Sequence, residues 1–312
     1  MSFSQSVKEE ILNNIKKMKG CCATSFLTAV LKSIGSICVD NNGYGYSVET
    51  DNGDLLMFSA ELSQWAFGAE CSVFQIDGED GKSPKFMGRF DVSLGEKLNL
   101  VFRDGEGLHI SNTPSVNLAK PCCRRAFVQG LFLSCGSASI PEVSDEKNFE
   151  SAHSNYHLEL RFSNAEFANF VQKEFAELDF RQTVRKSSTV LYLKDSEKIA
   201  DFFVYVDAVN AKFTVENVII GRSYRNNANR QRNCIESNID KTVNASEKHL
   251  AAIAKIRQAG KFALITPNLQ EIATLREQNP EANLSELATI LGISKSGVNH
   301  RLAKLLEIAE DL

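Results

Sequence analysis

Apolar residues recur with helical spacing in two segments that lie 101 positions apart in the chain. Each segment ends at a glycine, which predicts two apolar helices of similar length. The shared offset aligns Cys21-Cys22 with Cys122-Cys123, Phe26 with Phe127, Ser33 with Ser134, and Gly35-Ser36 with Gly136-Ser137. The chain therefore contains an internal repeat.

Small residues lie in the middle of both predicted helices, Ala29 in the first and Gly130 in the second. A missing side chain shortens the distance between two packed helices. We therefore expect the two helices to pack against each other about a pseudo-twofold axis.

Period-two alternation follows each helix and predicts strands, with further amphipathic helices between them. In the second half, Asn164 is a good N-cap for a helix that runs to Phe175, and Ser196 opens another helix. The predicted strands are Tyr44–Glu49, Cys71–Ile76 and Leu98–Phe102 in the first half, and His157–Phe162, Arg181–Arg185 and Thr189–Leu193 in the second. Each half is therefore expected to be α+β.

The end of the chain predicts a helix-turn-helix. An apolar stripe is formed by Leu284, Leu287, Ala288 and Leu291. Gly292 supplies the turn, and Ser294 can cap a second helix. On a helical wheel of the second helix, Val298, Leu302 and Leu305 face inward. The opposite face is small and polar, which suits the major groove, whereas the bland alternative is a solvated face. The candidate DNA-binding residues are Lys295, Ser296, Gly297, Asn299, His300, Arg301 and Lys304.

Charge is distributed unevenly along a chain whose formal net charge is −4. Residues 222–261 carry nine Lys and Arg against three acids, a balance typical of contact with a polyanion and equally of a solvated basic helix. The candidate contacts to DNA phosphates here are Arg222, Arg225, Arg230, Arg232 and Lys241. The predicted domains are 1–221 (halves about 1–118 and 119–221), a basic helical linker 222–261, and a helix-turn-helix domain 262–312.

The chain has eight cysteines and no segment that resembles an export signal or a membrane span. We therefore expect a cytoplasmic protein with reduced thiols. Adjacent cysteines on a helix point about 100° apart, so one such pair cannot chelate a metal as a spaced pair does. The cysteines are interpreted as buried packing residues, and no metal or other cofactor is expected.

Twin helices that end in Gly-Ser, each followed by an α+β half, resemble the LAGLIDADG homing-endonuclease fold. In active members of that family an acid precedes the glycine, and the two acids hold divalent metal ions. Here Ile34 and Cys135 occupy those positions, and neither residue can bind Mg²⁺. The residues beside them, Lys32, Ser33, Leu133 and Ser134, offer no carboxylate either. The resemblance therefore implies a fold without nuclease activity, so we do not expect an enzyme.

The run from Ile293 to Leu302 resembles the WhiA family of bacterial regulators. Further resemblance lies in Arg225-Asn226, Asn229-Arg230, Asn233-Cys234, Asn238 and Lys241-Thr242. The family joins a degenerate LAGLIDADG domain to a C-terminal helix-turn-helix. Two positions depart from its pattern, Ile235-Glu236 after the cysteine and Ala303 where a basic residue is common.

This resemblance implies a sequence-specific DNA-binding regulator of cell division and chromosome segregation, and of sporulation in sporulating lineages, acting at the nucleoid. The expected partner is double-stranded DNA and not a membrane. The alternative is that the first domain chiefly binds a protein, such as a sigma factor or another regulator, with DNA contact confined to the last domain. An active endonuclease ranks lowest.

Overall fold

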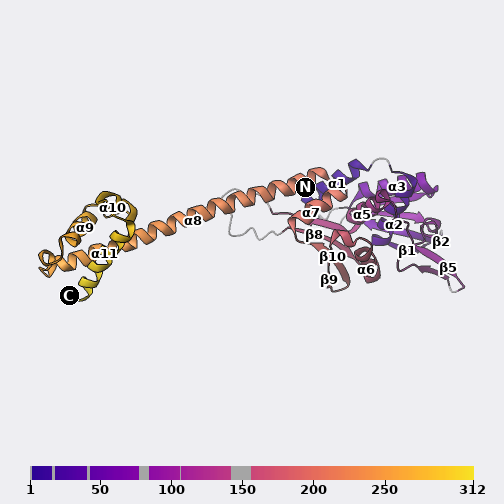
Figure 1. Cartoon of the computed structure of the whole chain (residues 1–312). Helices are drawn as coiled ribbons and strands as arrows, with labels where there is room; N and C mark the ends of the chain where they lie inside the picture. Colours follow the sequence, from indigo (N-terminus) through magenta and orange to yellow (C-terminus); the bar gives the residue numbers. More distant parts are fainter. Residues whose placement is uncertain (1, 16–17, 41–42, 77–83, 106, 142–155) are drawn as a thin grey trace. The chain divides into compact units, whose positions relative to one another are not determined.

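The computed structural model describes residues 2–15, 18–40, 43–76, 84–105, 107–141 and 156–312. The chain divides into two compact units, Met1–Arg222 and Ser223–Leu312, and Figure 1 labels many of their elements. Each unit contains a separate cluster of buried apolar side chains. Each therefore has a hydrophobic core of its own.

The first half of the first unit combines helices with an antiparallel sheet whose strand order is β1-β2-β4-β3. A separate hairpin, β5-β6, follows the sheet. The elements are α1 (Phe3–Asn14), α2 (Gly20–Ile34), β1 (Gly35–Asp40), β2 (Gly43–Thr50), α3 (Gly53–Phe67), β3 (Cys71–Ile76), β4 (Lys85–Asp91), α4 (Val92–Lys97), β5 (Val101–Asp104) and β6 (Gly107–Ile110).

The second half repeats this arrangement, with an antiparallel sheet of strand order β7-β8-β10-β9. In both sheets the first strand pairs with the second, and the second pairs with the fourth. The elements are α5 (Pro121–Cys135), β7 (Gly136–Ser139), β8 (His157–Phe162), α6 (Ala165–Glu174), β9 (Arg181–Arg185), β10 (Ser188–Leu193) and α7 (Ser196–Tyr205). The internal repeat predicted from the sequence is thus confirmed in the topology.

Helices α2 and α5 pack against each other, as their small residues predict. A Cβ added to Gly130 would lie 2.8 Å from the Phe26 carbonyl oxygen and 3.0 Å from the Ala29 Cβ. Both distances are shorter than normal van der Waals contact, so a side chain at Gly130 would push the helices apart. The two halves are therefore joined through a close backbone approach.

Both helices end at a glycine, as predicted, but neither glycine has the left-handed conformation that is common after a helix. Gly35 has φ −90° and ψ 154°, and Gly136 has φ −92° and ψ 150°, so both residues are extended and begin β1 and β7. A Cβ on Gly35 would lie 2.1 Å from the ring of Tyr46, and one on Gly136 would lie 2.6 Å from the ring of Phe132. A Cβ would also lie 2.3 Å from Leu31 O at Gly35 and 2.6 Å from Phe132 O at Gly136, so close contact with a ring and with a carbonyl oxygen, and not a positive φ, requires glycine at these positions.

The sequence pattern misplaced one strand and overlooked others. Leu98–Phe102 was expected to be a strand, but Leu98 caps α4 through its N–H bond to Leu94 O, and β5 begins only at Val101. The positive φ of Asn99, 55°, turns the chain there. The apolar residues of this segment are buried because of the turn and not because of strand alternation. The pattern also overlooked α1, β1, β4 and β7.

The second unit is helical. The long helix α8 (Val209–Gln258) runs from the first unit into the second, and α9 (Pro267–Gln278), α10 (Leu284–Leu291) and α11 (Lys295–Glu310) follow. Residues 222–258 of the expected basic linker lie in α8, and Ile253 and Ile256 are buried in the core of the second unit. Within the described residues, no helix has both the length and the apolar character needed to cross a bilayer.

Candidate nucleic-acid interface

The turn between α10 and α11 is built as the sequence predicts. Asn283 caps α10 by accepting the N–H groups of Ser285 (2.8 Å) and Glu286 (3.1 Å), and the Glu286 carboxylate accepts the Asn283 N–H at 2.8 Å. Gly292 has φ 64°, a left-handed conformation that glycine adopts without strain. Ser294 then caps α11 by accepting the Gly297 N–H at 3.1 Å. These caps fix where each helix begins and ends.

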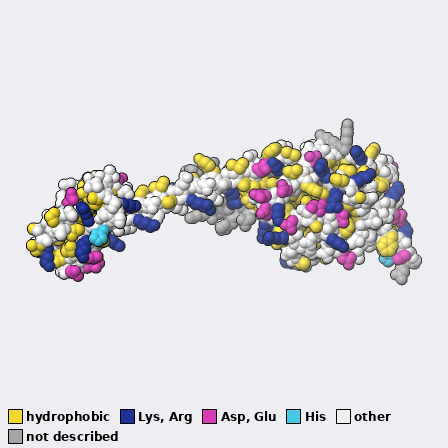
Figure 2. Space-filling model, in the orientation of Figure 1, with side chains coloured by type: hydrophobic (Ala, Val, Ile, Leu, Met, Phe, Trp, Pro, Cys, Tyr) yellow, Lys and Arg dark blue, Asp and Glu magenta, His cyan; other side chains and the backbone are white. Residues whose placement is uncertain are grey.

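One face of α11 is buried and the opposite face is free. Val298, Leu302 and Leu305 are at most 1% exposed and pack in the core of the second unit. The exposed side chains include Lys295, Ser296, Asn299, His300 and Lys304, which agrees with the helical wheel, and Ala303, Glu307 and Glu310 are exposed as well. Figure 2 shows basic side chains and a histidine on the visible surface of this unit. The first turns of the helix therefore present small, polar and basic side chains to solvent, and its last turns add two acids.

Two of the candidate cations on α11 already have acidic partners. Arg301, half-buried, lies 3.3 Å from Glu271 on α9, and Lys304 lies 2.6 Å from Glu307 one turn along α11. The bond with Glu307 raises the pKa of Lys304, and the same bond lowers the pKa of Glu307. Both partners are exposed to solvent, so these pairs are weak and can exchange for phosphate.

The structure brings together two candidate cations from separate elements. Lys241 on α8 and Lys295 at the start of α11 line one cleft of about 550 Å³, which also includes Asn283 and Ser285 at the start of α10. Arg230 lies eleven residues before Lys241, or about three helical turns, so both project from one side of α8. These lysines and the starts of two helices make a positively charged border beside α11.

The remaining basic residues of α8 have different surroundings. Arg230 and Arg232 are exposed, and Arg232 donates a hydrogen bond to Asn229 Oδ1 at 3.2 Å. Arg222 belongs to the first unit, where its guanidinium lies 5.5 Å from the centre of the Tyr156 ring.

Two buried polar residues that support this interface were not predicted. Arg276 is 1% exposed, and its Nη1 donates to the Ala282 carbonyl at 2.6 Å, which holds the loop between α9 and α10. Burial lowers the pKa of His249, and the nearby Arg276 charge lowers it further. Nothing in the local sequence pattern marks these residues, because their burial depends on how α8 and α9 pack.

A second cleft, of about 700 Å³, lies where α2 and α5 end, and Ile34 and Cys135 line it. The expectation that carboxylates are lacking here requires correction. Other segments supply Glu9, Asp51, Asp54 and Glu159 to the lining. Sequence neighbours could not reveal these acids, because they come from α1, the β2–α3 turn, α3 and β8.

Some charged groups of this cleft already interact with groups of opposite charge. Burial raises the pKa of Glu159, but hydrogen bonds from His157 (3.0 Å) and Arg161 (2.9 Å) outweigh it and leave that pKa below its usual value. Lys8 also lines the cleft, where burial lowers its pKa and the charge of Asp51 acts in the opposite direction. A lysine ammonium next to the cleft's acids competes with a divalent cation for them.

Comparison with known proteins identifies both units. Residues 124–225 match the family model described as the WhiA LAGLIDADG-like domain, and residues 228–309 match the one described as the WhiA C-terminal HTH domain. The "Probable cell division protein WhiA" of Caldicellulosiruptor bescii is 32% identical, over 100% of this chain and 96% of the relative. The chain belongs to the WhiA family. The protein of the same name from Lachnoclostridium phytofermentans is 33% identical, over 100% and 99%.

The WhiA architecture also appears among solved structures. The crystal structure of full-length DUF199/WhiA from Thermatoga maritima matches with a TM-score of 0.55 and 21% identity, over 100% of this chain and 99% of that one. This match confirms the fold class predicted from the sequence, a LAGLIDADG-like α+β domain followed by an all-α helix-turn-helix domain. The family resemblance carried by residues 293–302 is confirmed as well.

Proposed function

We propose that this chain is a sequence-specific DNA-binding transcriptional regulator whose helix α11 enters the major groove. The observation that carries the proposal is the polar, exposed face of α11 beside the basic border of Lys241 and Lys295. A recognition helix needs small and polar side chains at base edges and cations at the flanking phosphates. The second unit offers both on adjoining surfaces.

The residues of this interface divide into two roles. Ser296, Asn299 and His300 would exchange hydrogen bonds with base edges, and Gly297 would let the helix lie deep in the groove. The predicted phosphate contacts are Lys295, Arg301, Lys304, Arg222, Arg225, Arg230, Arg232 and Lys241. To contact phosphates, Arg301 would have to break its ion pair with Glu271, and Lys304 would have to break its ion pair with Glu307.

The biological setting of the proposal comes from the family. Relatives of this chain are named for cell division, and control of cell-division and chromosome-segregation genes is the finer role that we propose. Sporulation genes would join the targets in sporulating lineages. Such a regulator works at the nucleoid in the cytoplasm.

We further propose that the first unit has no nuclease activity. Ile34 and Cys135 stand where metal-binding acids belong, and Lys8 places an ammonium group in the same cleft. The acids that do line the cleft are partly engaged, since Glu159 pairs with Arg161 at 2.9 Å and with Arg185 at 3.3 Å. The unit then serves as a scaffold or as a second contact surface.

The alternative function for the first unit is binding of a protein, such as a sigma factor or another regulator. The unit exposes several large apolar side chains, among them Trp65 on α3 (63% exposed), Phe74 on β3 (53%) and Val184 on β9 (70%). Such side chains support this alternative where they adjoin in one patch that a partner can cover. If this alternative holds, DNA affinity belongs to the second unit alone.

Genome-wide mapping of sites bound by the full-length protein tests the proposed function. We expect enrichment at a shared sequence motif, and binding to that motif in vitro that weakens steeply with salt, since phosphate contacts release counterions. Scattered sites without a motif, or affinity independent of salt, would contradict it. Measuring the DNA affinity of residues 1–222 beside that of the full chain separates the two functions proposed for the first unit. A second DNA-contact surface would retain affinity for DNA, whereas a domain that only binds protein would not.

A further inference from the structure

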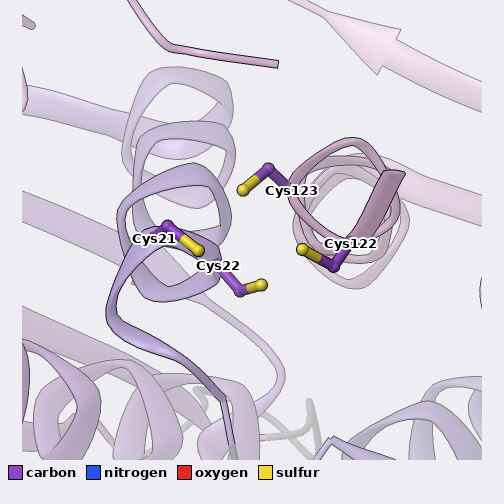
Figure 3. A group of neighbouring side chains, drawn as sticks. All are labelled: Cys21, Cys22, Cys122 and Cys123. Carbon is purple, nitrogen blue, oxygen red and sulfur yellow. The ribbon is translucent and has the colours of Figure 1, made fainter. Parts of the chain in front are cut away.

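The first turns of α2 and α5 bring four cysteines together. Cys21 and Cys22 lie on α2, Cys122 and Cys123 lie on α5, and the four Sγ atoms are all within 4.8 Å of one another. Figure 3 shows the two pairs facing each other across the gap between the helices. Among the residues that the structure describes, this is the group of potential metal ligands that converges on one point.

This arrangement changes the interpretation of the cysteine pairs. One adjacent pair cannot surround an ion, because its side chains diverge around the helix. Two pairs on facing helices supply four sulfurs from two sides. The sequence argument against a metal considered each pair alone and missed that the repeat places them opposite each other.

The distances fit a single tetrahedral ion. Zinc binds thiolate sulfur at about 2.3 Å, which places the four sulfurs of a tetrahedral site about 3.8 Å apart. The observed upper limit of 4.8 Å requires only small side-chain rotations to reach that geometry. An iron–sulfur cluster holds several metal and sulfide ions between its cysteines, so its thiolates stand farther apart than these.

The helix ends also favour an anionic centre. A zinc ion with four thiolates carries a net charge of −2, and the first turns of two helices supply positive partial charge and free N–H groups. The N-cap residues, Lys19 and Lys120, form no side-chain cap, unlike Asn52 of α3 and Asn164 of α6. Each lysine comes two residues before the first cysteine of its helix, and its charge has the sign that a thiolate centre needs.

Burial is suited to a structural ion. Cys22 and Cys123 are 7% and 2% exposed, whereas Cys21 and Cys122 are exposed to solvent. An ion can therefore enter from the surface and then be shielded on its inner side. Four protein sulfurs leave no open coordination position, which is the mark of structural and not catalytic zinc.

We propose that Cys21, Cys22, Cys122 and Cys123 bind one Zn²⁺ ion that clamps the two halves of the first unit together. Each thiol releases its proton to solvent as its zinc–sulfur bond forms, and no oxidant or reductant takes part. The clamp lies at the starts of α2 and α5, and the cleft with Ile34 and Cys135 lies at their ends. Cys21 and Ile34 are 13 positions apart on α2, as are Cys122 and Cys135 on α5, which is about 20 Å of helix, so the zinc is independent of the nuclease-like cleft.

The test begins with the metal content of the full-length protein, purified under reducing conditions and measured by mass spectrometry. We expect about one zinc per chain. Cys21→Ser and Cys122→Ser, both at exposed positions, should weaken zinc binding at least about 100-fold, since losing a residue that only hydrogen-bonds a metal ligand already costs about 10–100-fold. Cys38→Ser and Cys234→Ser are the matched controls and should retain the zinc.

Two further measurements use the unmodified chain, so that the test does not depend on the variants folding. Co²⁺ added to metal-free protein should give the charge-transfer band of thiolate coordination and the visible bands of a tetrahedral site. Removing zinc with a chelator should lower the melting temperature, and adding Zn²⁺ should restore it. A chain without stoichiometric metal, a Co²⁺ spectrum lacking thiolate bands, or native Cys–Cys disulfides between the helices would overturn the proposal, as would iron in place of zinc.

Discussion

Gly297 lies in the first turn of α11 although the fold does not require glycine there. The nearest atom to an added Cβ would be Ser294 Oγ at 3.4 Å, an ordinary contact, and the residue does not have a positive φ. Glycine weakens a helix by about 1 kcal/mol relative to alanine. In our proposal, Gly297 is explained by the major groove of DNA, which approaches the helix backbone at this position.

Gly297→Ala should therefore separate stability from DNA binding. We expect the second unit to gain up to about 1 kcal/mol in urea unfolding, and the chain to bind its DNA site less tightly, since the new methyl group would stand between helix and bases. Ala303→Gly is the reverse control on the same helix and should lose stability without a clash. Full affinity in Gly297→Ala would count against close approach at this position.

His249 is expected to make the stability of the second unit depend on pH. It is 8% exposed, its Nδ1 has no hydrogen-bond partner among the residues that the structure describes, and burial together with the charge of Arg276 lowers its pKa. The unfolded chain therefore binds a proton at a pH where the folded chain does not. Stability is fully present above the unfolded pKa of about 6.5 and is lost as pH falls below it toward the folded value.

Urea unfolding of residues 223–312 between pH 7.5 and pH 5 measures this effect. We expect the free energy of unfolding to decrease over that range in the unmodified unit and to decrease less in His249→Gln. His300→Gln, at an exposed position, is the control and should behave like the unmodified unit. A pH dependence that His249→Gln leaves unchanged would assign the sensitivity to other groups.

Single residues were predictable from the sequence where one element decides their surroundings. The inward positions of Val298, Leu302 and Leu305 follow from helical period alone. The burial of Arg276 and the location of Lys8 in the cleft depend on contacts between segments that are distant in the chain, which local sequence patterns do not predict.

At the scale of elements, α2 and α5 depend on their close approach at Gly130. Gly130→Ala adds a methyl group 2.8 Å from the Phe26 carbonyl oxygen, a backbone atom that cannot rotate away. We expect the free energy of unfolding of the first unit to fall by about 1–3 kcal/mol, as overpacking generally causes. Gly20→Ala, on α2 with no atom within 4 Å of the added Cβ, is the control for thermal denaturation. Equal melting temperatures would show that the helices can separate freely.

The elements differ in how clearly the sequence announces them. Helices α2, α5, α10 and α11 carry long apolar stripes and were predicted from these alone. Strand β7 consists of small residues, Gly136–Ser139, and pairs with β8 because it directly follows α5, whose end lies beside β8. Such a strand is specified by its neighbours in the fold and has no alternating pattern of its own.

The whole molecule combines two units whose chemistry was only partly visible in the chain. The repeat was read from the sequence by aligning the two copies, and the missing acids were inferred from the resemblance to the LAGLIDADG fold, in which Ile34 and Cys135 take their places. The meeting of four cysteines was not, because it needs both the repeat and the helix pairing in three dimensions. Only the tertiary structure shows that the two cysteine pairs together form a candidate metal site.

Full-length protein should leave supercoiled plasmid intact in the presence of Mg²⁺ or Mn²⁺. Ile34 and Cys135 cannot hold these ions, and Lys8 opposes their entry into the cleft. Gel electrophoresis after long incubation measures the outcome. Nicking that persists through repurification and disappears in Asp51→Asn or Asp54→Asn would show that the cleft's acids form a working site.

The central claim is that α11 recognises bases while neighbouring cations hold phosphates. Competition binding of the full-length protein against its mapped site and a scrambled duplex tests it most directly. Asn299→Ala and His300→Ala should lose about 1–3 kcal/mol on the mapped site and little on the scrambled one. Lys295→Ala should weaken both alike and reduce the slope of log K against log salt by about 1. An Asn299→Ala or His300→Ala protein that keeps its full preference for the mapped site would contradict the account.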